Sequence, residues 1–225
     1  MTIGIIVAMS KELRLILPLL DNAASETRGG TEFHTGDIGP HRVVVMECGI
    51  GKVNAAMGAT LMAELYNPAL VINSGVAAGA GEDVAVMDTV IATSLAHHDF
   101  WCIGEEWGHV PGSPRLFPAT GFADIIPDGE GIKRGLICSG ELFISRREEV
   151  EAIRGHFPDV KAIDMESAAI AQVCCHRGIP FFCMRVISDS PWCSHNNSRQ
   201  YEDFWEDAPA HSFTLVKKLL ENLPA

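Results

Sequence analysis

The chain has 225 residues, of which 47% are hydrophobic and 20% are charged, as is typical of a globular protein. A chain of this length is expected to fold as one domain over residues 1–225. Its 17 lysine and arginine residues against 29 acidic residues give a net charge of −12. This charge would repel nucleic acid and anionic membranes, so it favours a small-molecule partner.

No segment approaches the run of about 20 apolar residues that would cross a bilayer. The seven cysteines include no C-x-x-C pair, and several lie inside apolar runs such as FFCMRVIS, which indicates reduced thiols in the core. We therefore expect a cytoplasmic protein.

Short apolar runs alternate with longer helical patterns, and this alternation is typical of an α/β domain. The runs are nearly continuous in apolar residues, which indicates strands buried on both faces of a sheet. In chain order, the expected strands are residues 3–8, 42–47, 70–73, 88–93, 135–139 and 181–188, with 160–163 as a further candidate. The expected helices are residues 11–20, 52–65, 147–156, 165–177 and 209–222. Residues 97–133 are rich in glycine, proline and aromatic residues and predict no regular element, as is common for a functional loop or an interface.

Three acidic residues stand near the carboxyl ends of expected strands, where ligands bind in open α/β sheets. Glu12 follows the first strand, Glu166 follows the candidate strand 160–163, and Asp189 follows the last strand. Each also has an ordinary explanation, as a favourable charge in a first helical turn or as a turn residue before a proline. If the three acids share one edge, their repulsion keeps at least one of them protonated near neutral pH.

Arg185 lies in the middle of an expected buried strand, where a guanidinium is costly unless it is paired. We therefore expect it to contact one of the carboxylates, either as a structural ion pair or as part of a site. His97, His98 and Asp99 do not form a metal set, because adjacent side chains point apart. The glycine-rich segment CGIGKVNAAMG matches neither a P-loop nor a full dinucleotide fingerprint. No metal and no cofactor are expected.

Six segments spread over the whole chain carry a resemblance to a known family: GIIVAMSKEL, CGIGKVNAAMGAT, VINSGVAAGA, SGELFIS, IDMESAAIA and RVISD. Their order and spacing resemble those of the bacterial 5′-methylthioadenosine/S-adenosylhomocysteine nucleosidases, which belong to the purine nucleoside phosphorylase and uridine phosphorylase superfamily. The resemblance implies a three-layer α/β/α fold with a central mixed, twisted β-sheet. It also implies a homodimer that hydrolyses the N-glycosidic bond of methylthioadenosine, adenosylhomocysteine or both, and releases adenine.

The same resemblance implies a role for each site residue. Glu12 would activate the attacking water, Asp189 would protonate the purine ring nitrogen, and Arg185 would help to hold the water and orient the acids. Glu166 would bind the ribose hydroxyls. The implied substrate-binding set also contains Met165 on the sugar, Phe143 on the base, backbone groups of Ile144 at the adenine edge, Ser188 beside Asp189, Phe204 as a closing ring, and Val76, Ala77 and Ile50.

These residue types suit the reaction, because N-glycosidic cleavage needs an acid on the leaving group and a base for water on the opposite face of the sugar. Phosphorylases of the superfamily hold phosphate with arginines, one of them just before the glycine-rich turn, where this chain has VINSG without a cation. Water is therefore the expected nucleophile.

Three departures from the family pattern leave alternatives open. Val76 stands where the nucleosidases usually carry a serine that touches the water, Asp164 stands where a glutamate is common, and residues 100–114 diverge in a region that reaches across the dimer interface to the 5′ pocket. A related hydrolase acting on futalosine or another purine nucleoside is the first alternative. A phosphate-dependent phosphorylase and a nucleoside-binding module with an inactive site are the others.

Overall fold

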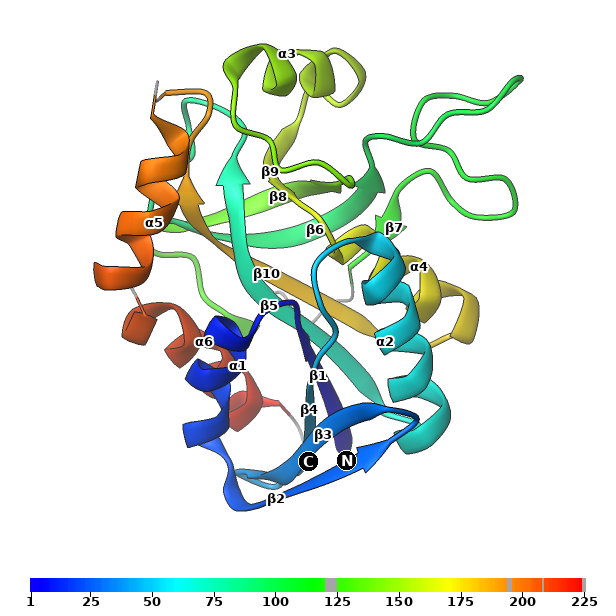
Figure 1. Ribbon diagram of the computed structural model, residues 1–225, viewed down its shortest axis with the longest axis vertical. Helices are drawn as coiled ribbons and strands as arrows, with labels where there is room; N and C mark the ends of the chain where they lie inside the picture. Colours follow the sequence, from blue (N-terminus) through cyan, green and yellow to red (C-terminus); the bar gives the residue numbers. More distant parts are fainter. Residues whose placement is uncertain (120–124, 194–195, 208, 224–225) are drawn as a thin grey trace.

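The computed structural model describes residues 1–119, 125–193, 196–207 and 209–223. Within them, a 10-stranded mixed sheet forms the centre and helices cover both of its sides (Figure 1). The strands are β1 (Thr2–Val7), β2 (Asp21–Arg28), β3 (Thr31–Ile38), β4 (His41–Glu47), β5 (Leu70–Gly79), β6 (Thr89–His97), β7 (Phe117–Pro118), β8 (Ile132–Ser139), β9 (Val160–Asp164) and β10 (Phe181–Asp189). The helices are α1 (Ser10–Ile16), the 3₁₀ helix η1 (Leu17–Leu19), α2 (Lys52–Tyr66), α3 (Arg147–His156), α4 (Ser167–Arg177), α5 (Asn197–Asp207) and α6 (Pro209–Asn222).

The sheet has two parts that share β5. On one side, β5 pairs with β10 and β9, and these connect through β6 and β8, so that five strands close into a barrel-like ring. On the other side, β1, β4, β3 and β2 follow in order as an open sheet. The strands β4, β1, β5 and β10 run parallel to one another, so their carboxyl ends lie at one edge of the sheet.

The side chains of β1 alternate between the two faces of the sheet, as a strand requires. Ile5 packs with Val216 and Leu219 of α6 in one buried cluster. Ile6, which points to the opposite face, packs in another cluster with Ala55 of α2. The run of β1 is therefore apolar at nearly every position because helices cover both faces, as the sequence predicted.

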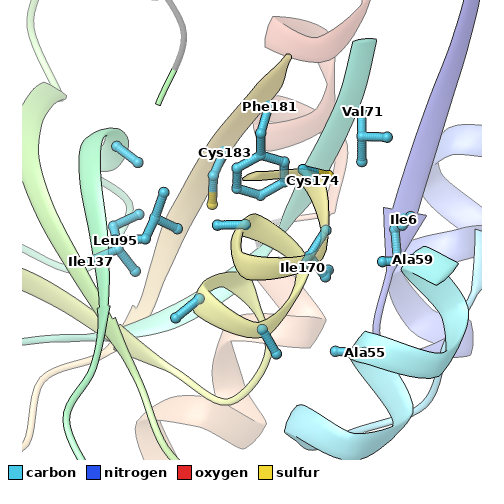
Figure 2. Close-up of a cluster of buried hydrophobic side chains, with 14 of the residues drawn as sticks. Ile6, Ala55, Ala59, Val71, Leu95, Ile137, Ile170, Cys174, Phe181 and Cys183 are labelled. Carbon is cyan, nitrogen blue, oxygen red and sulfur yellow. The ribbon is translucent and has the colours of Figure 1, made fainter. Parts of the chain in front are cut away.

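The alanine-rich helix α4 is buried because its side chains are small enough for close packing. Figure 2 shows α4 lying between the strands that carry Leu95 and Ile137 and the helix α2 that carries Ala55 and Ala59. This tight packing fixes the N-terminus of α4, which faces the carboxyl edge of the sheet.

The predicted α/β class and mixed sheet are confirmed, but several elements differ from the sequence prediction. The exposed strand β2 and its partner β3 were missed, because β2 has the polar sequence DNAASETR and no buried residue. Its pairing depends on the turn at Gly29 and Gly30, whose φ angles of 60° and 81° suit a tight hairpin. The helix expected at 11–20 ends at Ile16, because Pro18 cannot continue an α-helix and instead opens η1.

Other differences concern ends of elements and one missing helix. The strand expected at 70–73 continues to Gly79, and the helix expected from 165 begins at Ser167, with Glu166 as its N-cap. Helix α5 was not predicted. No regular element was predicted for residues 97–133. The described residues between His97 and Phe117 form no helix or strand, but β7 and the first residues of β8 lie within the predicted range, and residues 120–124 lie outside the described part of the chain. Throughout the described part of the chain, every helix is too short or too polar to cross a lipid bilayer.

Candidate active site

A pocket lies at the carboxyl edge of the sheet, beside the ends of β1, β5, β9 and β10. Every residue that was predicted for the site lines it, except Arg185 and Phe204: Glu12, Asp189, Glu166, Met165, Phe143, Ile144, Ser188, Val76, Ala77 and Ile50. The lining also contains residues that the prediction missed: Ala8, Met9, Ala78, Leu142, Ile163, Asp164 and Tyr201. Three of these, Ala78, Leu142 and Asp164, adjoin a predicted residue in the sequence, and the other four do not.

Glu12 lies in the first turn of α1, and its carboxylate turns back over the end of β1. Its Oε2 accepts hydrogen bonds from the backbone N–H groups of Ala8 at 2.9 Å and Met9 at 3.0 Å. Its Oε1 accepts one from the N–H of Val76 in β5 at 3.0 Å. Burial raises the pKa of Glu12, while the positive charge of Arg185 and the three N–H groups oppose that rise. The carboxylate is therefore held in one orientation between two strands.

Asp189 is the last residue of β10, and its carboxyl group is buried. Its Oδ1 accepts a hydrogen bond from the hydroxyl of Ser188 at 2.5 Å, whereas Oδ2 has no partner among the described residues. Burial raises the pKa of Asp189, and the side chains of Ser188 and Asn197 lower it in part. The register of β10 shifts between Ile187 and Asp189, an irregularity that redirects a side chain at a strand end. Asp189 thus presents a carboxyl oxygen that tends to keep a proton.

Glu166 occupies the N-cap position of α4, where its Oε1 accepts a hydrogen bond from the N–H of Gly51 at 2.9 Å. Gly51 has a φ of 97°, in the left-handed region that favours glycine, and this turn directs its N–H to the carboxylate. Burial and the nearby charge of Asp164 raise the pKa of Glu166 to about 7. The sequence-based expectation that one acid would hold a proton near neutral pH therefore fits Glu166.

Arg185 lies behind the pocket in β10 and forms a buried ion pair with Asp164, with Nε 2.8 Å from Oδ2. Its other nitrogen atoms donate to the carbonyl of Met184 at 3.1 Å and to the side-chain oxygen of Asn73. Asp164 also accepts a hydrogen bond from the hydroxyl of Ser139 at 2.5 Å. The prediction that Arg185 contacts a carboxylate is confirmed. However, Arg185 does not line the pocket, so it acts on the site through its charge and through Asp164.

Two aromatic rings cover one side of the pocket. Phe143, in the loop between β8 and α3, meets Tyr201 of α5 edge to face, with ring centroids 5.6 Å apart. Phe204 had been predicted as the closing ring, but it lies one turn further along α5 and packs against Val186 and Trp205. The structure therefore assigns this side of the pocket to Tyr201. The sequence could have pointed to Tyr201, because it lies three positions before Phe204 and therefore on the same side of a helix.

Comparison with known proteins is consistent with this geometry. The model of the phosphorylase superfamily matches residues 2–221. A 5′-methylthioadenosine/S-adenosylhomocysteine nucleosidase of Bacillus thuringiensis (strain Al Hakam) is 38% identical over 232 residues, which cover 99% of this chain and 100% of the relative. The chain belongs to the phosphorylase superfamily, in the family of these nucleosidases. The resemblance inferred from the sequence is thereby confirmed.

Two similar solved nucleosidase structures contain a bound ligand. The S. pneumoniae enzyme with the transition-state inhibitor MT-ImmA is 33% identical, with a TM-score of 0.93 and 100% of both chains covered. The Neisseria meningitidis enzyme in complex with methylthio-immucillin-A is 34% identical, with a TM-score of 0.91 and 99% of both chains covered. The fold described above is therefore the fold of this family over its full length.

Proposed function

We propose that the protein hydrolyses the N-glycosidic bond of 5′-methylthioadenosine, S-adenosylhomocysteine or both, and releases adenine and the 5-thio-substituted ribose. The observation that carries this proposal is the contrast between two carboxyl groups in one pocket. Asp189 has a raised pKa and an unpartnered oxygen, whereas Glu12 is oriented by three backbone N–H groups. Two acids in different surroundings are what separate acid and base roles require.

In the proposed reaction, Asp189 donates its proton to a ring nitrogen of the purine as the bond to the sugar breaks. The electron pair of that bond leaves with the base, and the sugar becomes an oxocarbenium-like cation. Glu12 accepts a proton from the water that bonds to the anomeric carbon. Burial raises the pKa of Glu12, which makes it a stronger base than an exposed glutamate. Exchange of protons with solvent then restores both groups.

Glu166 is proposed to bind the ribose hydroxyls, with Met165 packed on the sugar. Its negative charge would also stabilise the cationic sugar. Arg185 is proposed as a positioning residue that limits the mutual repulsion of Glu12, Asp164 and Glu166, since its charge lowers the pKa of both Glu12 and Glu166.

The base is proposed to lie against Phe143 and Tyr201, with backbone groups of Ile144 at the adenine edge. Ser188 would orient Asp189 through the 2.5 Å hydrogen bond. The role of Val76 is proposed to be that of its backbone N–H, which holds Glu12.

Water rather than phosphate is proposed as the nucleophile. Among the described residues that line the pocket there is no lysine or arginine to hold a phosphate dianion. The guanidinium of Arg185 is already engaged by Asp164. Phosphate should therefore leave the rate of base release unchanged, and a rate that rises with phosphate would restore the phosphorylase alternative.

The test of the proposed function is a comparison of substrates and variants. Purified protein is incubated with methylthioadenosine, adenosylhomocysteine, futalosine and inosine, and release of the base is followed. We expect cleavage of one or both of the first two, and cleavage of only futalosine or inosine would overturn the proposal. Asp189→Asn should abolish turnover while ligand affinity is largely retained, whereas binding without turnover by the unmodified protein would indicate an inactive binding module.

We also propose a homodimer, with the segment between β6 and β7 as part of its interface. In Figure 1 this green segment projects from the body of the molecule. Its side chains Trp101 and Ile103 are 54% and 91% exposed, and large exposed apolar groups often mark interfaces. Light scattering during size-exclusion chromatography gives the mass of the protein in solution. A monomer at micromolar concentration would contradict this proposal.

We also propose that the protein works in a reducing cytoplasmic setting, because its seven cysteines are free.

A further inference from the structure

Asn197, the first residue of α5, has an unusual placement for a polar side chain at the start of a helix. It is only 3% exposed, although its neighbours Asn196 and Ser198 are exposed. Its Nδ2 donates a hydrogen bond to the carbonyl of Ile144 at 3.4 Å, across 53 residues of sequence. A buried carboxamide is costly unless it is hydrogen-bonded, so this contact gives a reason for the inward placement.

The carboxamide of Asn197 also lies beside Asp189. The side chain of Asn197 lowers the pKa of Asp189 in part and so opposes the effect of burial. One side chain therefore reaches both groups at the proposed base-binding end of the pocket: the strand end that carries the acid, and the loop that carries Ile144.

Two buried oxygen atoms at this end, Oδ2 of Asp189 and Oδ1 of Asn197, have no hydrogen-bond partner among the described residues. Buried polar atoms without partners are rare in folded proteins, and they often mark a position that a proton or a ligand completes. Asn197 itself does not line the pocket. It can therefore act on a ligand only through its two neighbours.

We propose that Asn197 is a positioning residue that fixes the acid Asp189 and the carbonyl of Ile144 relative to each other, so that both meet the same purine. This inference rests on the proposed function, because it assigns Asp189 as the general acid. Asn197 is not proposed as a catalytic residue, since it does not line the pocket. A simple helix cap would need no contact with either Ile144 or Asp189.

The test compares Asn197→Ala and Asn197→Asp with the control Ser198→Ala on the same turn of α5. For each protein, kcat, KM and the pH dependence of kcat/KM are measured with methylthioadenosine, and adenine affinity is measured by calorimetry. We expect Asn197→Ala to lower kcat/KM by about 10²-fold, as small misplacements of a reacting group can do. Adenine affinity should fall as well, and Ser198→Ala should leave all values unchanged.

The pH profile separates positioning from a merely structural role. Asp189 must be protonated to act, so activity falls as pH rises through its pKa. Loss of the amide removes a contact that lowers that pKa, and the alkaline limb should move to higher pH in Asn197→Ala. Asn197→Asp adds a second negative charge beside Asp189, so the alkaline limb should move to a still higher pH in this variant. The other titratable groups that line the pocket, which are Glu12, Asp164, Glu166 and Tyr201, are the same in all variants.

The possible outcomes are distinct. An unchanged pH limb and unchanged adenine affinity in Asn197→Ala, with only a lower melting temperature, would show a structural cap and overturn the proposal. If Asn197→Ala does not fold, the isosteric Asn197→Asp carries the test alone. If the unmodified protein cleaves no nucleoside, the proposed function fails, and the adenine titration still decides whether Asn197 positions the base-binding groups.

Discussion

Gly75 in β5 faces the carboxylate of Glu12 so closely that a Cβ atom on Gly75 would lie 2.4 Å from Oε1. Real Cβ atoms are essentially never found at such a distance. The carboxylate therefore occupies space that exists only because residue 75 has no side chain. This close approach explains why the segment NSGV of β5 has a glycine at position 75. It also links that glycine to the orientation of Glu12, the proposed base.

The variant Gly75→Ala should displace Glu12 from its three backbone donors. We expect kcat to fall by about 10²-fold, because the base would be moved by an ångström or more from the water it activates. The matched control is Gly155→Ala in α3, where an added Cβ meets nothing within 4 Å. This control should retain full activity and gain a little stability, since alanine is favoured over glycine in a helix. Equal activity in Gly75→Ala and the unmodified protein would refute the role of Glu12.

The ion pair between Arg185 and Asp164 supports a prediction about stability. Both side chains are almost fully buried, and removal of one partner leaves an uncompensated charge, which costs about 3–5 kcal/mol. Arg185→Met should therefore lower the free energy of unfolding in urea by that amount and also raise the pKa of Glu12 and Glu166. The exposed pair of Arg147 and Glu151 is the control, because Arg147→Met should cost less than about 1 kcal/mol.

A double variant tests whether the cost comes from the unpaired charge. Arg185→Met combined with Asp164→Asn removes both charges, so the loss of stability should be clearly smaller than the sum of the two single losses. Additive losses would mean that the two residues stabilise the fold independently of each other.

The sequence predicted well those features that depend on burial. Apolar runs such as residues 42–47 became strands with helices over both faces, and the cost of an unpaired guanidinium correctly predicted a partner for Arg185. Strand β2 could not be found in this way, because an exposed strand has no apolar pattern and depends on its pairing with β3. Local pattern therefore identifies elements that build the core and misses elements that only extend the sheet.

The site shows a different limit. Glu12 and Asp189 could be grouped because β1 and β10 both run parallel to β5 and end at one edge. Glu166 follows β9, which runs antiparallel to β5, and the individual roles of all three acids came from the resemblance. Helix α5 carries Tyr201, Phe204 and Trp205 within two turns, and of these three only Tyr201 lines the pocket. Which of these faces the ligand depends on how the helix packs on the sheet, and periodicity alone does not determine that.

The assignment of Tyr201 leads to a direct comparison within α5. Tyr201→Ala should raise KM by about tenfold, since aromatic contacts contribute about 0.5–1.5 kcal/mol beyond their buried area. Tyr201→Phe should have little effect, because the hydroxyl contacts the sulfur of Met9, at 3.4 Å, and the side chain of Trp205, and neither is an acid of the site. Phe204→Leu should lower the melting temperature more than it changes KM. Substrate kinetics and thermal unfolding distinguish these outcomes, and a larger KM effect at Phe204 would return the closing role to that residue.

The raised pKa of Glu166 predicts that this residue lowers the stability of the protein at neutral and alkaline pH. Its folded-state pKa of about 7 lies above the usual 4.5, so the native state binds more protons than the unfolded state between these values. The free energy of unfolding contributed by this residue therefore falls as pH rises from about 4.5 to about 7. Glu166→Gln removes this loss, so the variant should melt higher than the unmodified protein at pH 8 and show little difference at pH 4.5.

The same variant should bind methylthioadenosine more weakly, because an amide accepts hydrogen bonds from the ribose hydroxyls less strongly than a carboxylate does. The exposed Glu151→Gln is the control, and its melting temperature should not depend on pH differently from that of the unmodified protein. Stabilisation of Glu166→Gln by the same amount at pH 4.5 and pH 8 would show that burial of the charge is not the cause. A buried carboxylate kept at a cost to stability is what a residue retained for ligand binding would show.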